Sequence, residues 1–271
     1  MSIAVFLPPQ LVTHVRHVFM HEADFFVAGS WDDLDGIIRR EALDVLIVDP
    51  SADGVVNIDA VAGILNVFPS LPLVGYVMLT ATSFGAIAQL SRRGLVHVVL
   101  HKFGDSRERL QQTIARVRVH PPSQRLMKIM GPALKRVPIN LARSIGEMFD
   151  KPHRYSSVLD IALAAQLPPV SVYRYLEGVR LTSPKKLLIA AKMSRGLTYL
   201  RDPGYSVSDV AVKLGYRHPR IFTSHAIEVF EQTPSRIRSR MTEEDATTML
   251  VRWVTMPTMP VKGGGQLVQQ L

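Results

Sequence analysis

Five short runs rich in β-branched residues alternate with five helical patterns across residues 1–119. The runs lie at 3–7, 25–28, 44–48, 73–79 and 96–100, and the helical patterns lie at 11–20, 31–40, 56–68, 84–93 and 106–117. Runs such as VLIV and LVGYVML suit parallel strands that are covered on both faces. The first part of the chain is therefore predicted to be an α/β domain, a (βα)5 doubly wound parallel sheet, with any site at the carboxyl ends of its strands.

The segment 204–238 predicts two short helices separated by a tight turn. Ser206 is suited to cap the first helix with Asp209 as its capping-box partner, and Gly215 supplies the turn. The second helix opens at His218-Pro219. Its apolar positions are Phe222, Ala226 and Phe230, at i, i+4 and i+8. One face of this helix is therefore predicted to pack against the rest of the domain, and the opposite face to be exposed and available to read DNA.

A second copy of this plan lies upstream. One helix begins at Ser157, the turn Leu167-Pro168-Pro169 follows, and Val172 and Leu176 point inward from the next helix. A long helix then starts at Ser183-Pro184 and ends at the break formed by residues 202–204. The chain after residue 119 is therefore predicted to be all-α, with one rod carrying two helix-turn-helix units.

The positive charge of the chain belongs to this helical part. Residues 1–119 hold 10 Lys and Arg against 12 Asp and Glu, whereas residues 120–271 hold 22 against 11. Lys and Arg side chains that neutralise DNA phosphates release counterions and supply most non-specific affinity. The lysines expected to contact the phosphate backbone are Lys185, Lys186, Lys192 and Lys213.

The Ser-initiated helix, the Leu-Gly-aromatic turn and the later Phe-x-x-Thr-Pro-Ser sequence together resemble the AraC/XylS family of transcription regulators, over residues 138–240. Such proteins bind DNA with two helix-turn-helix units whose reader helices enter successive major-groove turns, about 34 Å apart. The resemblance implies base-reading roles for Val170, Tyr173 and Arg174 in the first unit, and for Arg217, His218, Arg220, Ile221 and Ser224 in the second. Arginine bonds guanine bidentately, and apolar or aromatic side chains touch thymine methyl groups.

Four positions depart from the family pattern. Gln166 and Leu181 stand where glycines are expected, Lys192 stands where arginine is common, and Ala226 replaces a second phenylalanine. We expect the fold to be retained, with Ile227 or Val229 repacking beside Ala226.

Residues 1–119 resemble a response-regulator receiver domain. The likeness rests on Asp49 after the third strand, Thr80-Ala81 after the fourth and Lys102 after the fifth. In receivers the aspartate accepts a phosphoryl group, the Thr and Lys contact it, and two acids after the first strand hold Mg2+. Here Leu7-Pro8-Pro9 replaces the acid pair, and Phe103 replaces the usual proline. Because phosphoryl transfer relies on the metal, we predict a degenerate receiver kept for protein or ligand contacts. A structural ion pair between Asp49 and Lys102 is the equal alternative.

Other motifs give little indication of chemistry. His14, His17 and His21 recur along one helix and would offer a zinc-binding or pH-sensitive stripe, although an ordinary polar face is favoured. The chain has no cysteine, no Ser-His-Asp set and no phosphate-cradling loop, so we predict no enzyme activity, no metal and no cofactor. It has no export signal pattern and no apolar stretch of membrane length, which predicts a cytoplasmic protein with no membrane partner.

The predicted organisation is a receiver-like domain at 1–119, a linker helix at 120–137, a DNA-binding domain at 138–240, and a capped helix with a flexible tail at 241–271. The predicted function is sequence-specific transcription regulation through double-stranded DNA, with RNA polymerase as a partner that the family resemblance implies. A homodimer formed through the receiver-like domain or the linker stays open. Two alternatives also stay open: a phosphorylatable two-component regulator, and an adaptor that has lost DNA binding.

Overall fold

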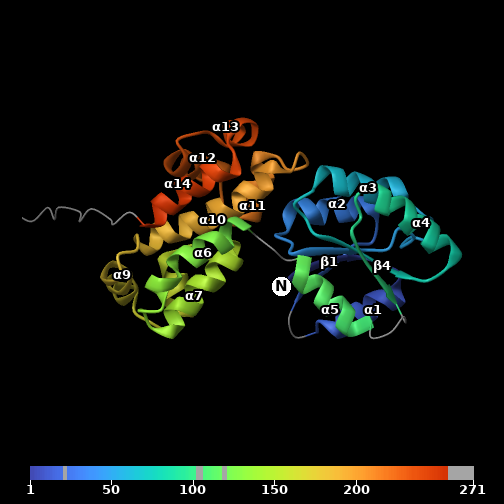
Figure 1. Ribbon diagram of the computed structural model, residues 1–271, viewed down its shortest axis with the longest axis horizontal. Helices are drawn as coiled ribbons and strands as arrows, with labels where there is room; N and C mark the ends of the chain where they lie inside the picture. Colours follow the sequence, from blue (N-terminus) through green and yellow to red (C-terminus); the bar gives the residue numbers. More distant parts are fainter. Residues whose placement is uncertain (21–22, 102–105, 118–120, 256–271) are drawn as a thin grey trace, which may run out of the picture.

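The computed structural model describes residues 1–20, 23–101, 106–117 and 121–255 (Figure 1). Five parallel strands form one sheet in the order β2-β1-β3-β4-β5. The strands are β1 (Ser2–Phe6), β2 (Asp24–Val27), β3 (Val45–Val48), β4 (Leu73–Met78) and β5 (His97–His101). This order is that of flavodoxin-like folds, and it confirms the predicted doubly wound sheet.

Helices cover both faces of the sheet (Figure 1). They are α1 (Pro9–Val18), α2 (Trp31–Arg40), α3 (Ile58–Val67), α4 (Ala81–Arg92) and α5 (Ser106–Val117). Alternate strand residues point to opposite faces, so Ile3 and Val5 pack with α1 and α5, whereas Ala4 and Phe6 pack on the side of α2 and α3. The helix α4 begins three residues before the predicted start because Thr80 caps it and accepts a hydrogen bond from the Ser83 amide at 3.1 Å.

The rest of the described chain is helical, as predicted. It comprises α6 (Pro121–Leu134), α7 (Ile139–Asp150), the 3-10 turn η1 (Pro152–Arg154), α8 (Val158–Ala164), α9 (Pro169–Gly178), α10 (Pro184–Arg201), α11 (Val207–Lys213), α12 (Pro219–Phe230), α13 (Pro234–Arg240) and α14 (Glu243–Thr255). We refer to residues 2–117 as the sheet domain and to residues 121–255 as the helical domain. Among the described helices, none is long and apolar enough to cross a membrane.

The helix α10 is the axis of the helical domain. It contacts α6, α7, α8, α11, α12, α13 and α14, and nearly all of its residues are buried. The predicted linker helix is one of these neighbours, because Leu126 and Met130 of α6 are buried and the Ser123 hydroxyl lies 3.0 Å from that of Ser194 in α10. The predicted C-terminal helix is confirmed as α14, where the Thr242 hydroxyl accepts from the Asp245 amide at 3.1 Å.

Candidate DNA-binding interface

The first helix-turn-helix unit consists of α8 and α9. The backbone N–H of Ser157 donates to the Asp160 carboxylate at 2.9 Å, which fixes the start of α8. Val172 and Leu176 of α9 are buried, as predicted, and they leave the opposite side of α9 exposed. The predicted reader residues lie there: Val170 is 78% exposed, Tyr173 is 45% exposed, and Arg174 is exposed.

The second unit consists of α11 and α12. The predicted capping box is present, since the Asp209 amide donates to the Ser206 hydroxyl at 3.1 Å and the Ser206 amide donates to the Asp209 carboxylate at 2.8 Å. Gly215 makes the turn in the left-handed region, with φ 72°. The predicted inner residues Phe222, Ala226 and Phe230 are all buried.

The predicted reader residues of the second unit are all on the outside. Ile221 is 42% exposed. The other exposed members are Arg217, His218, Arg220 and Ser224. The proposed surfaces of α9 and α12 are therefore both open to a partner, and α10 joins their two units.

The departures from the family pattern have specific local outcomes. Gln166 takes the left-handed conformation, with φ 53°, at the position where a glycine was expected. After α9 the left-handed residue is Arg180, with φ 58°, one position before Leu181, which is buried instead. Beside Ala226, Val229 is buried whereas Ile227 is 45% exposed, so Val229 is the inward one of the two.

Two of the four lysines expected to contact phosphates are buried, so this part of the prediction was wrong. The Lys192 ammonium lies 4.6 Å from the ring centroid of Tyr216, and burial lowers the pKa of Lys192 to about 8. Lys213 is 2% exposed and bonds to the sheet domain. Lys185 is exposed, and Lys186 is half-buried with its ammonium 4.7 Å from the Trp253 ring centroid.

A groove of about 670 Å3 lies between the two units. Its walls come from the start of α8, from α10 and from the start of α12. Lys185, Arg217 and His218 line it, together with the apolar side chains of Ile189 and Ile221. The groove thus combines basic groups with residues of α12.

The predicted receiver site has an aspartate after β3, whereas Leu7-Pro8-Pro9 follows β1. Asp49 is buried after β3, and its carboxylate accepts bonds from the amide and the hydroxyl of Ser51 at 2.8 and 2.6 Å. Thr80 caps α4, Leu7 is buried after β1, and Lys102 lies outside the described residues. The predicted ion pair between Asp49 and Lys102 therefore stays untested.

The predicted histidine stripe is only partly described, because His21 lies outside the described residues. His17 is exposed, whereas the His14 ring lies 4.8 Å from the His101 ring, and burial lowers the pKa of His14. In the part of the chain that the structure describes, no group of three or more His, Asp or Glu side chains is placed to hold a metal ion.

A family model described as a helix-turn-helix domain matches residues 161–240, which run from within α8 to the end of α13. Among solved structures, full-length FixJ from B. japonicum is similar to the chain with a TM-score of 0.38 and 9% sequence identity, over 83% of this chain and 95% of that chain. The strand order of the sheet is that of flavodoxin-like folds in general. The comparison with curated proteins finds no match. Residues 161–240 are therefore an AraC-type helix-turn-helix domain, and an α/β domain with a five-stranded parallel sheet precedes it in the chain.

Proposed function

We propose that this protein is a sequence-specific transcription regulator that reads two successive major-groove segments of double-stranded DNA with α9 and α12. One observation carries the proposal: each reader helix buries one face and exposes the residues assigned to base reading. The 18 residues of α10 give a rod of about 27 Å between the two units, comparable with the helical repeat of B-DNA.

The groove between the units suits the DNA backbone that passes between two major-groove segments. Lys185 and Arg217 place positive charge at this groove, and phosphate contacts of this kind fix register without reading sequence. Base discrimination is assigned to the reader helices, where Arg220 is free to bond guanine.

Arg220→Ala should weaken binding to the preferred site by about 1–3 kcal/mol and relax the preference at one base pair. The preferred site is obtained first, by selecting bound oligonucleotides from a random pool with the full-length protein. Binding of wild type and variant to the selected duplex and to a random duplex is then measured over a range of salt concentrations.

Lys185→Ala is the matched control, because Lys185 is exposed at the groove and not on a reader helix. This change should weaken binding to both duplexes alike and make the affinity less dependent on salt concentration. Equal losses on both duplexes for Arg220→Ala would contradict its reader role. A wild-type protein that binds neither duplex would instead favour the adaptor that has lost DNA binding.

We further propose that the sheet domain controls this activity without phosphorylation, through contacts with a protein or ligand. The Asp49 carboxylate is engaged by Ser51, and Leu7 occupies the place of the receiver acid pair. Hard oxygen ligands for Mg2+ are thus missing from the end of β1. RNA polymerase contact and self-association stay predictions from the family resemblance.

Incubation with acetyl phosphate and Mg2+ should leave the intact mass of the protein unchanged, because no metal would neutralise the charge that develops during transfer. Asp49→Asn, treated in parallel, controls for modification elsewhere on the chain. One added phosphoryl group per wild-type chain, absent from the Asn variant, would establish the phosphorylatable regulator instead.

A further inference from the structure

The helical domain contacts the sheet domain at the amino-terminal ends of the strands. The loop 41–44 precedes β3 and the loop 68–72 precedes β4, so both lie where strands begin. Asp49 and Thr80 follow strands, so they lie at the opposite, carboxyl-terminal ends of the strands. We call the contacts of these two loops and of α2 with α10, α11 and residues 202–205 the docking interface. It therefore lies away from the receiver-like site.

Lys213 of α11 caps the C-terminal end of α2. Its ammonium donates to the Ile38 carbonyl at 2.6 Å and also to the Glu41 carbonyl. The ammonium lies 4.6 Å from the ring centroid of Tyr205 and 5.1 Å from that of Tyr199. Carbonyls at the end of a helix carry its partial negative charge and lack partners within the helix. This lysine is thus stabilised by groups from both domains.

A second buried cation reaches the same loop. Arg195 of α10 donates to the Leu43 carbonyl at 3.3 Å, and its guanidinium lies 3.7 Å from the Asp44 carboxylate. Both charged side chains are at most 6% exposed. Buried charges need partners of opposite sign, and Arg195 and Asp44 are such partners for each other across the docking interface. The loop before β3 is therefore held by α10 as well as by α11.

The turn between α10 and α11 fits tightly against the loop before β4. The Gly204 amide donates to the Val67 carbonyl at 2.9 Å, and the Asp202 carboxylate accepts from the Ser70 amide at 2.9 Å. A Cβ on Gly204 would lie under 3.0 Å from the side chains of Val67 and Phe68. Only a glycine fits here while the domains are docked.

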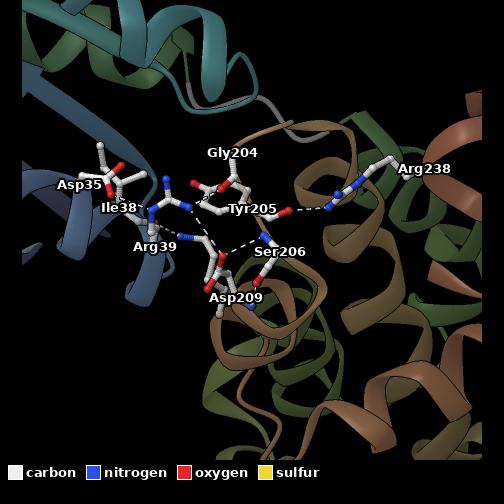
Figure 2. A network of polar contacts seen from close by, with 9 residues as sticks. Asp35, Ile38, Arg39, Gly204, Tyr205, Ser206, Asp209 and Arg238 are labelled. Atoms are coloured by element: carbon white, nitrogen blue, oxygen red, sulfur yellow. Dashed lines mark hydrogen bonds and ion pairs between the residues drawn. The ribbon is translucent and has the colours of Figure 1, made fainter. Parts of the chain in front are cut away.

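Figure 2 shows that this turn is also held by arginines from both domains. Arg39 of α2 donates to the Gly204 carbonyl at 2.5 Å, and its guanidinium lies 3.8 Å from the Asp209 carboxylate. Arg238 of α13 donates to the Tyr205 carbonyl at 2.5 Å. The first helix of the second unit is therefore fixed at its N-terminal end by the sheet domain and by its own domain.

The docking interface leaves the DNA-reading surfaces open. Its contacts come from α10, α11 and the turn between them, and they include none of the eight reader residues. Tyr173 and Ile221 stay exposed while the domains are docked. We propose that the docked arrangement is the DNA-binding form, and that the sheet domain braces α11 so that the second unit keeps its position. This proposal rests on the proposed DNA-binding function.

Gly204→Val in the full-length protein tests whether the sheet domain holds α11 in position for DNA binding. The three atoms nearest to an added Cβ all belong to Val67 and Phe68 of the sheet domain, and Gly204 does not have a left-handed φ, so the change is directed at the docked arrangement. The variant should expand in solution scattering and bind the selected duplex about tenfold more weakly, within the usual range of coupling between sites. Gly29→Val is the matched control, because nothing lies within 4 Å of a Cβ at Gly29.

The double variant Gly204→Val/Lys213→Glu removes the ammonium as well and places a carboxylate beside the α2 carbonyls. An expanded variant that binds DNA with the wild-type affinity or more tightly contradicts the proposal that the sheet domain supports α11. Docking would then be neutral for DNA binding or would inhibit it. A double variant that stays compact also contradicts the proposal, because docking would then not depend on these contacts. A wild-type protein that binds no duplex refutes the proposed function instead, whatever the variants do.

Discussion

Gly215→Ala will destabilise the helical domain by about 2–5 kcal/mol. Gly215 has φ 72°, and a left-handed conformation costs an L-residue about 1–2 kcal/mol. A Cβ there would also lie 2.7 Å from the carbonyl oxygen of His153, which belongs to the backbone of η1 and cannot rotate away. Overpacking of this kind costs about 1–3 kcal/mol more. The turn of the second unit is therefore expected to be lost or to push η1 aside.

Urea unfolding followed through Trp253 measures this loss, in a Trp31→Phe background that leaves the tryptophan of α14 as the sole reporter. Gly54→Ala is the control, because Gly54 has φ 90° and a Cβ there meets nothing within 4 Å. Unfolding of the Gly54→Ala control is followed by circular dichroism. Its free energy of unfolding should fall only by the cost of the left-handed conformation, about 1–2 kcal/mol. Equal losses for the two variants would show that the contact with His153 does not matter.

Phe222→Ala should cost about 3–5 kcal/mol and abolish binding by the second unit. Phe222 is fully buried, with its ring centroid 5.8 Å from that of Tyr216. Its ring also borders Gly196, where an added Cβ would lie 3.3 Å from it. The ring thus fills the space between α10 and α12, and removing it leaves a cavity beneath the reader helix.

The same unfolding measurement applies to Phe222→Ala, with Phe84→Ala as its control. Phe84 is 67% exposed on α4, so its removal should change stability by no more than about 0.5 kcal/mol. A loss below about 1 kcal/mol for Phe222→Ala would mean that α12 is held by something other than this side chain.

Local signals in the sequence predicted the elements well. Ser30 caps α2, and Ser206 with Asp209 caps α11, so both helices begin where the sequence indicates. The α4 start was placed too late because the apolar pattern begins at Phe84, whereas the Thr80 cap sets the helix boundary. The exposure of the proposed reader residues was also predictable, since the buried side of α12 defines its exposed side.

Burial that depends on distant segments was not predictable in this way. Lys192 and Lys213 have the side chain and the spacing of surface residues, yet both are buried. Lys192 is enclosed because its ammonium lies against the Tyr216 ring, and Lys213 because α2 ends against it. Neither fact is visible in the residues near either lysine. The docking interface as a whole belongs to this class, because it joins segments more than 130 positions apart.

The strand β3 has a carboxylate just beyond each end. Asp44, which faces Arg195, stands before it, and Asp49 stands after it, about 16 Å away in an extended chain. Five peptide units thus connect Asp49 to Asp44, the carboxylate that faces Arg195 of α10. The buried strand β3 is thus the direct covalent connection between the end of the sheet that holds Asp49 and the end that contacts the helical domain.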